Sequence, residues 1–205
     1  MRSSRQNIIE ATQRILQTRG LTRATTREIA REAKITEGLI YHHFKDKAEL
    51  IYEVVETLVS ETKDLLQNLP LRVGTRTLRE NLEEILYSVY KAQYEITPII
   101  CAIFADRKLH ARMLEIMQER GIGPQHTIQG LIVYLAAEQR MGRLSDAVDA
   151  QTIAKCLLFI SMQAATNDRL MELTTDKEHI RREIHGYVQI LMTGLSPFTK
   201  GKDEL

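Results

Sequence analysis

The residues best suited to chemistry stand close together between positions 36 and 47 of the 205-residue chain. Tyr41, His42, Lys45 and Lys47 place hydroxyl, imidazole and ammonium donors within a few residues of one another. Donors of these kinds make many of the contacts to phosphate oxygens in protein–DNA complexes. Their spacing therefore predicts a surface that contacts a nucleic-acid backbone.

Two short helices must position these donors. Thr25 and Thr26 are candidate N-caps, and Glu28 follows Thr25 by three residues, as in a capping box. Thr36 is the candidate N-cap of the second helix, which ends near Phe44. Such a pair is typical of a helix-turn-helix, whose second helix lies in the DNA major groove. The residues that we expect to contact DNA are Arg5, Thr25, Thr26, Arg27, Thr36, Glu37, Gly38, Leu39, Tyr41, His42, Lys45 and Lys47.

Gly38 is an unusual residue for the first turn of the second helix. Glycine inside a helix costs about 1 kcal/mol relative to alanine. One reason to tolerate it is the close approach of another backbone, such as a sugar-phosphate chain. The glycine therefore supports DNA contact at this helix.

These motifs together resemble the DNA-binding signature of TetR-family transcriptional regulators. The matching elements are Gly20 after a long first helix, TTREIAREA at 25–33, GLIYHHF at 38–44 and KDKAEL at 45–50. The resemblance implies an all-α homodimer. In such a dimer an N-terminal helix-turn-helix domain reads operator DNA, and a larger helical domain binds a small molecule and dimerises.

The resemblance is weaker outside that signature. Ala33, Lys34 and Ile35 stand where the family more commonly has a G-V-S-like triplet, and we expect Lys34 to face solvent. Beyond residue 50 the match consists of length, helical pattern and a closing Gly194-Leu195 pair.

Composition and periodicity favour helix throughout. The chain has no tryptophan and only four prolines, and sustained period-2 alternation is absent. We expect helices at 4–19 and from 47 to about 69, and Pro98 is expected to break or kink the path of a later helix. The expected domains are 1–47 for DNA binding and 48–205 for effector binding and dimerisation, with the helix from Lys47 as the lever between them.

The charge is unevenly distributed along the chain. Residues 1–50 carry a net charge of +4 and the remaining residues −3, which gives +1 in total. A basic module on a mildly acidic body fits nucleic-acid contact confined to one end.

The family resemblance implies an effector pocket on the central helices, while ordinary core packing is the alternative for each residue. Tyr90 and Tyr94 share a helix face, and the scarcity of charge on these inner faces favours a hydrophobic or aromatic effector. The candidate pocket residues are Tyr87, Tyr90, Tyr94, Ile99, Cys101, Phe104, Met113, Met117, Tyr134 and Phe159.

The resemblance also implies that the last two long helices pair across a two-fold axis as a four-helix bundle. Packing within one subunit is the alternative. The candidate dimerisation residues are Leu157, Ser161, Ala164, Ile184, Val188 and Leu191.

Other function classes have less support. No G-x-S-x-G, C-x-x-C, H-E-x-x-H or phosphate-loop motif is present, which argues against an enzyme. Adjacent His42 and His43 point about 100° apart on a helix, so we expect no metal there and no cofactor. A helical adaptor that binds protein through its C-terminal helices stays open as an alternative. The expected function is a ligand-responsive repressor that its effector releases from an operator.

The expected environment is the cytoplasm. No run of 18 apolar residues and no leader-like segment is present. Cys101 and Cys156 stand in apolar helical segments and are expected to be buried, reduced thiols.

Overall fold

A computed structural model describes residues 3–121, 124–173 and 176–193. Within these residues the chain is all-α, as expected. The helices come in the order α1 (Ser4–Arg19), η1 (Leu21–Arg23), α2 (Thr26–Ala33), α3 (Glu37–His43), α4 (Lys47–Asn68), η2 (Leu69–Arg72), α5 (Leu78–Ala105), α6 (Arg107–Glu119), α7 (Pro124–Arg140), α8 (Ala150–Leu170) and α9 (Lys177–Thr193). The Gly194-Leu195 pair lies outside the described residues.

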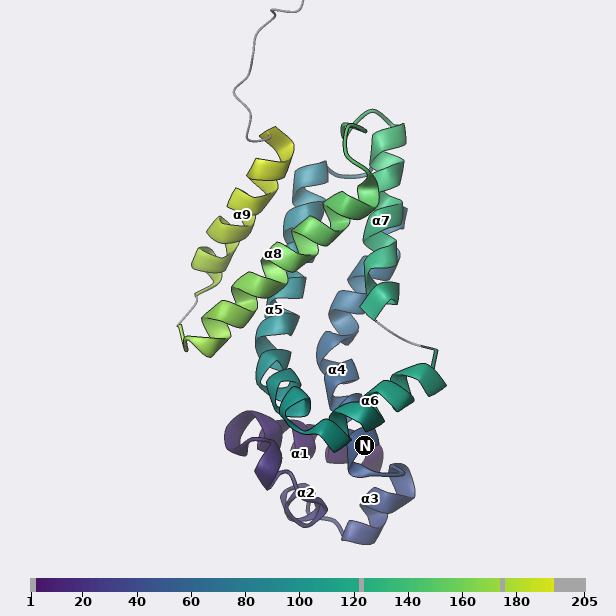
Figure 1. The fold of residues 1–205 in the computed structure, drawn as a ribbon, viewed down its shortest axis with the longest axis vertical. Coiled ribbons are helices and arrows are strands. Elements are labelled where there is room, and N and C mark those ends of the chain that lie inside the picture. Colours follow the sequence, from purple (N-terminus) through teal and green to yellow (C-terminus); the bar gives the residue numbers. More distant parts are fainter. Residues whose placement is uncertain (1–2, 122–123, 174–175, 194–205) are drawn as a thin grey trace, which may run out of the picture.

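Helices α1 to α3 gather at one end of an elongated molecule, and α7 to α9 form the other end (Figure 1). Helices α4 and α5 run between the two ends, and α6 lies across the junction. In the described residues, no helix combines the length and apolar character needed to cross a membrane.

Two hydrophobic cores hold these ends together. The N-terminal core joins α1–α3 to the first half of α4, the last turns of α5 and the inner face of α6; its members include Ile8, Ile29, Ile40, Leu50, Ile99, Ile103, Met113 and Ile116. The body core joins the remainder of α4 and α5 to α7, α8 and α9; its members include Leu66, Leu82, Leu86, Tyr134, Leu157 and Ile184. Helices α4 and α5 thus contribute to both cores, and the N-terminal core extends past the boundary predicted at residue 47.

Helix α5 does not break at Pro98. The sequence predicts a break or a kink there, and the break is wrong, because the α-helix continues through Pro98 to Ala105. Proline lacks the backbone N–H that would bond to the carbonyl of Tyr94, but this removes one bond of a 28-residue helix. Packing of Thr97 and Ile99, both buried, holds the helix together on either side.

The two cysteines also differ from expectation, because both Cys101 and Cys156 are exposed. Each lies on a helix whose opposite face is buried, namely Ile99 and Ile103 on α5 and Ala154 and Leu158 on α8. An apolar neighbourhood in sequence therefore did not reveal which face each thiol occupies.

A close approach of α7 to α4 gives Gly130 a role that sequence reasoning missed. A Cβ at Gly130 would overlap the backbone carbonyl of Leu66. We expect Gly130→Ala to separate the two helices and lower the free energy of unfolding by about 2–3 kcal/mol, as overpacking does. Gly38→Ala is the matched control, since nothing lies within 4 Å of a Cβ there. Urea denaturation measures both, and equal stability of the two variants would contradict the close approach.

Candidate nucleic-acid interface and ligand pocket

Helix α2 begins with one half of the expected capping box. The Thr25 side chain accepts the backbone N–H of Glu28, with N···Oγ1 at 3.2 Å. The Glu28 carboxylate does not return the bond; it pairs instead with Arg31 and, at 3.5 Å, with Arg19 of α1. Arg14 bonds to Glu32 at 3.2 Å in the same way. The acidic residues of α2 therefore attach this helix to α1.

The turn between α2 and α3 depends on Lys34. Lys34 has φ of 56°, in the left-handed region. Its N–H bonds to the carbonyl of Arg31, while the N–H of Ile35 bonds to that of Ala30, which is the Schellman arrangement of a helix C-terminus. Lys34 is exposed, as expected, and Ile35 packs against the N-terminal core.

Lys34→Gly should stabilise the protein. A left-handed conformation costs a residue with a Cβ about 1 kcal/mol, and glycine avoids that cost. We expect the free energy of unfolding to rise by about 0.5–1 kcal/mol, as measured by urea denaturation. Lys34→Ala keeps the strained Cβ and is the control; a gain of the same size in that variant would contradict a backbone origin.

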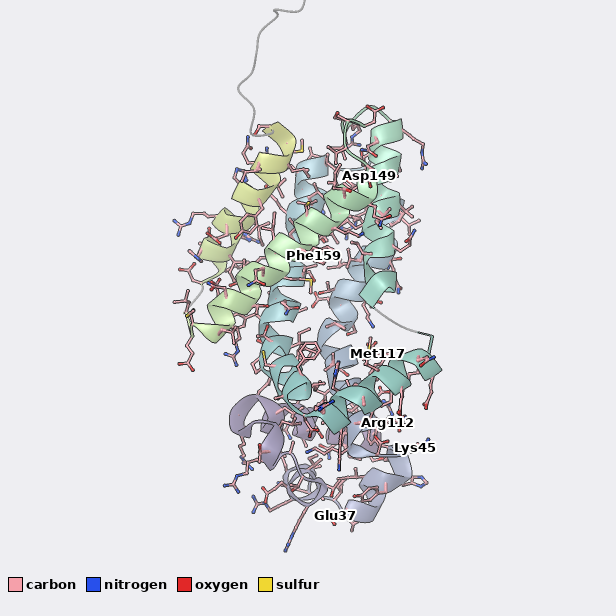
Figure 2. All side chains as sticks on the ribbon, viewed as in Figure 1. Glu37, Lys45, Arg112, Met117, Asp149 and Phe159 are labelled. Carbon is pink, nitrogen blue, oxygen red and sulfur yellow. The ribbon has the colours of Figure 1, made fainter. Side chains whose placement is uncertain are left out.

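Helix α3 directs one face into the core and the other into solvent. Ile40 and, just after the helix, Phe44 are buried, whereas Gly38, Tyr41 and His42 are exposed. Tyr41 is 58% exposed although its ring is apolar. Figure 2 shows Glu37 of this helix at the tip of the molecule, far from Asp149 and Phe159 of the body. Helix α3 therefore presents a free surface that a DNA groove can approach.

Most of the residues predicted to contact DNA lie on this end with side chains in solvent. The exposed ones are Thr25, Arg27, Thr36, Glu37, Gly38, Tyr41, His42 and Lys45. The hydroxyl of Thr36 makes no capping bond in α3, and the Thr26 hydroxyl lies 3.3 Å from Glu37. Leu39 is half-buried.

Two residues predicted to contact DNA, Arg5 and Lys47, instead bond to other parts of the protein. Arg5 bonds to Glu53 of α4 at 2.7 Å, and its guanidinium lies 5.1 Å from the centre of the Phe44 ring. The Lys47 ammonium is half-buried and donates to the carbonyl of Leu21 at 3.4 Å. Burial lowers the pKa of Lys47, although the charge of Asp106 opposes this effect.

Helix α6 holds the connection between α3 and α4 through ion pairs that the sequence did not reveal. Arg112 Nε donates to Asp46 at 2.9 Å, and Asp46 also caps α4 by accepting the N–H of Glu49 at 2.8 Å. Arg120 bonds to Glu49 at 2.9 Å and Glu53 at 2.6 Å. Residues more than 60 positions apart form these pairs, so no local pattern could have identified them.

The charges at this connection alter the pKa of its carboxylates. Burial acts to raise the pKa of Asp46, but the Glu49 amide and the Arg112 guanidinium outweigh it and lower the pKa overall. Burial likewise acts to raise the pKa of Glu53, and the bonds from Arg5 and Arg120 lower it overall. Both carboxylates are therefore held ionised at neutral pH.

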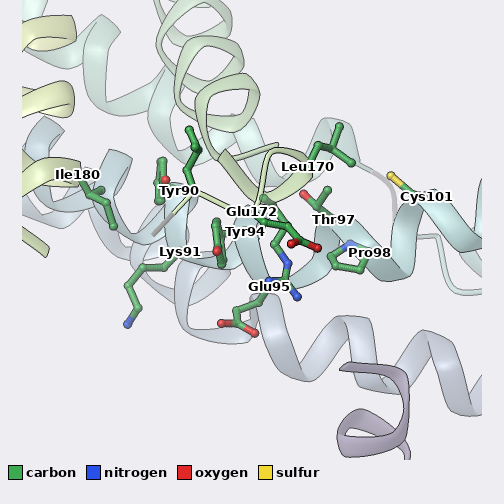
Figure 3. A pocket seen from close by; sticks show the side chains of 12 residues that line it. Tyr90, Lys91, Tyr94, Glu95, Thr97, Pro98, Cys101, Leu170, Glu172 and Ile180 are labelled. Atoms are coloured by element: carbon green, nitrogen blue, oxygen red, sulfur yellow. The ribbon is translucent and has the colours of Figure 1, made fainter. Parts of the chain in front are cut away.

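A pocket of about 790 Å³ lies between α5, the C-terminal end of α8 and the start of α9 (Figure 3). We call it the α5–α8 pocket. The residues that line it are Tyr90, Lys91, Tyr94, Glu95, Thr97, Pro98, Cys101, Arg169, Leu170, Glu172, Leu173 and Ile180. The rings of Tyr90 and Tyr94 stack with centres 6.3 Å apart, and Arg169 lies 5.1 Å from the centre of the Tyr94 ring. Its size and mixed lining suit a small organic molecule.

The predicted pocket residues separate into two groups. Tyr90, Tyr94 and Cys101 line the α5–α8 pocket, and Tyr87 lines a second hollow of about 660 Å³ between α5 and α9. The others line neither pocket: Ile99, Met113 and Met117 pack in the N-terminal core, Tyr134 is buried in the body core, and Phe104 and Phe159 point into solvent. Burial raises the pKa of Tyr134 to about 12.

The lining corrects the expectation of an uncharged pocket. Lys91, Glu95, Arg169 and Glu172 all contribute to it, beside apolar Leu170 and Ile180. Helical periodicity indicates only the inner helix faces, whereas the pocket opens at the surface, where charged side chains stand.

The predicted dimerisation residues lie on the inward faces of their helices. Leu157, Ser161, Ile184 and Val188 are buried against the subunit's own body core, while Ala164 and Leu191 are partly buried against it. Little of their surface is left for a partner. The exposed apolar residues of these two helices are Phe159, Ile160, Met162, Leu170, Ile190 and Met192, and we call Phe159, Ile160, Met162, Ile190 and Met192 the outer face of α8 and α9.

Sequence comparison connects this arrangement to known regulators. A family model described as bacterial regulatory proteins of the tetR family matches residues 8–54. The HTH-type transcriptional regulator TtgR of Pseudomonas putida is 30% identical over 161 residues, covering 74% of this chain and 73% of TtgR. The uncharacterised HTH-type transcriptional regulator YdgC of Bacillus subtilis is 24% identical over 200 residues, covering 98% and 95%.

Solved structures share the fold. A TetR-family regulator from Mesorhizobium loti superimposes with a TM-score of 0.71 at 19% identity, covering 92% of this chain and 95% of that one. The regulator FadR of Bacillus subtilis, solved in complex with stearoyl-CoA, gives 0.71 at 14% identity, covering 93% and 99%.

Proposed function

The chain belongs to the TetR family of bacterial regulatory proteins, and from this premise we propose that it is a repressor released from its operator by a small molecule. Members of the family are DNA-binding transcriptional regulators and not enzymes. The observation that carries the proposal is the exposed face of α3, with Gly38, Tyr41 and His42 in solvent at the tip of the molecule.

We assign α3 to the major groove and its neighbours to the phosphates. Thr36, Glu37 and Leu39 are at the start of α3. In the proposed complex this start would face the groove, where side chains of a recognition helix reach base edges. Thr25, Arg27, Tyr41 and Lys45 surround that start and would bond to phosphates. Arg5 and Lys47 would act mainly by holding this end together, since their side chains are engaged with Glu53 and Leu21.

The protein would bind its operator as a homodimer. The outer face of α8 and α9 offers apolar side chains that a second copy would cover, with Phe159 63% exposed and Ile160 46% exposed. A dimer places two recognition helices in successive major grooves, about 34–36 Å apart. Its operator would then be an inverted repeat, as two-fold symmetry requires.

The α5–α8 pocket is the proposed effector site. Tyr94, which stacks on the buried Tyr90, offers an aromatic face, and the exposed Leu170 offers an apolar one. The effector would be a molecule with a hydrophobic or aromatic body, and Lys91 and Arg169 would suit a polar group on it. An effector can release DNA only if it binds the free conformation more tightly than the DNA-bound one.

Two steps test the proposal. Purified protein is denatured and the released small molecules are identified by mass spectrometry; the operator is selected from duplexes that include the DNA upstream of the protein's own gene. Fluorescence anisotropy then measures operator affinity with and without each molecule. We expect affinity to fall about 5- to 150-fold with the effector. Tighter DNA binding in its presence would contradict release and indicate a corepressor.

A further inference from the structure

Helix α5 is the one lining element of the α5–α8 pocket, among the described residues, that also reaches the N-terminal core. The pocket takes its other residues from α8, α9 and the segment between them, and those elements contribute to the body core alone. Helix α5 lines the pocket from Tyr90 to Cys101; Ile99 within this stretch and Ile103 just after it pack in the N-terminal core. No residue of α4 lines the pocket.

The stretch of α5 at the pocket also contains the proline of this helix. Pro98 cannot donate to the carbonyl of Tyr94, so the helical ladder lacks a bond at that turn. Tyr94 and Pro98 both line the pocket, and Figure 3 shows them beside Glu95 along this stretch of the helix. Helices bend most readily at proline. A molecule in the pocket would therefore press on the turn of α5 that bends at least cost.

The same turn makes a direct bond to the DNA-binding end. Gln17 Nε2 of α1 donates to Glu95 Oε2 at 2.8 Å, across 78 residues of sequence. Glu95 lines the pocket, and α1 carries Ile15 and Leu16 in the N-terminal core. One side chain thus contacts both the pocket and the helix against which α2 and α3 are packed.

We propose that an effector in the α5–α8 pocket acts on the DNA-binding end through α5, which bends at Pro98 and carries Glu95, Ile99 and Ile103 against α1 and α6. This inference rests on the proposed function and specifies its route. No residue of α4 lines the pocket, so the effector would not contact α4 directly. In this proposal α4 moves only because the N-terminal core, to which it contributes, is displaced.

Cys101 supplies a test that needs no identified effector, because it lines the pocket and is exposed. In a Cys156→Ser protein, N-ethylmaleimide attaches to Cys101 and the adduct occupies the pocket. The readout is the ratio of operator dissociation constants with and without the adduct, so that a changed starting affinity cancels. We expect the adduct to weaken operator binding about tenfold, within the usual range of allosteric coupling.

Two variants test whether the effect of the adduct passes through α5. Pro98→Ala restores the missing N–H and stiffens the turn, and we expect it to reduce the tenfold ratio to below about twofold. The control carries Phe104→Cys with both native cysteines changed to serine. It places the same adduct on exposed α5 surface outside the pocket, where we expect no change of more than about twofold. An unchanged affinity at Cys101, or a full tenfold ratio that survives Pro98→Ala, would overturn the inference.

Hydrogen exchange gives a second measurement if Pro98→Ala does not fold. The Cys101 adduct should change amide protection in residues 99–105 and in α1 around Gln17. Changes confined to α4 would overturn the α5 route. Failure of the unlabelled protein to bind any operator would instead remove the proposed function and this inference with it, so the two failures are distinguishable.

Discussion

Phe159→Glu should convert the proposed homodimer into a monomer and lower operator affinity by about a thousandfold or more. Phe159 is 63% exposed on the outer face of α8 and α9, so the substitution does not disturb the subunit's own core. In the dimer it would place a carboxylate in an apolar interface, and an isolated buried charge costs several kcal/mol. A monomer engages one half-site and loses the avidity of the second.

Light scattering and anisotropy measure the two effects together. Phe104→Glu is the matched control, because Phe104 is likewise exposed, at 64%, but lies on α5 outside this face. We expect the control to remain dimeric. A Phe159→Glu protein that stays dimeric and binds operator normally would show that another surface pairs the subunits.

Gly38→Ala should change stability and DNA binding in opposite directions. A Cβ at Gly38 meets nothing within 4 Å in the free protein, and alanine is the better helix former by about 1 kcal/mol. The free energy of unfolding should therefore rise by up to about 1 kcal/mol. The same methyl would stand where we propose that the sugar-phosphate backbone approaches α3. We therefore expect operator affinity to fall about 10- to 100-fold, which corresponds to about 1.4–2.8 kcal/mol.

Glu178→Ala, an exposed change in the first turn of α9, is the control for Gly38→Ala. We expect operator affinity to stay within about twofold in that variant. Urea denaturation and anisotropy on the same samples separate the two effects. Unchanged affinity in Gly38→Ala would show that DNA does not approach α3 at this residue.

The helix-turn-helix could be predicted from sequence because its signals are local. Thr25 caps α2 through a residue three positions away, and Ile40 and Phe44 are apolar at helical spacing. Each signal extends over less than two turns of helix. The expected return bond from Glu28 to the Thr25 backbone does not form, because the Glu28 carboxylate pairs with Arg19 of α1 and Arg31 of α2. The pairing with Arg19 cannot be inferred from spacing.

The faces of α8 could not be predicted, because this helix is apolar on both sides. Leu157 and Leu158 pack inward, while Phe159 and Ile160, the next two residues, face outward. Periodicity identifies an apolar stripe but not whether its partner is the same subunit or a second one. The dimerisation residues chosen from sequence therefore fell on the inward stripe.

The pocket and its connection to α1 depend on tertiary contacts. Tyr90 and Tyr94 were found through their shared helix face, and their stacking agrees with that spacing. Lys91, Glu95 and Arg169 were missed because charged residues near a helix surface normally face only solvent. The bond from Gln17 to Glu95 joins two helices far apart in sequence, for which composition and spacing give no signal.

The most direct test of the account is an anisotropy titration of the intact protein against its selected operator and against an unrelated duplex of the same length. If a dimer binds with α3 of each chain in the major groove, we expect two chains per inverted-repeat site and a dissociation constant of about 10⁻⁸ to 10⁻¹¹ M. Binding to the unrelated duplex should be at least about 10³-fold weaker. Equal affinity for both duplexes, or one chain bound per site, would contradict it.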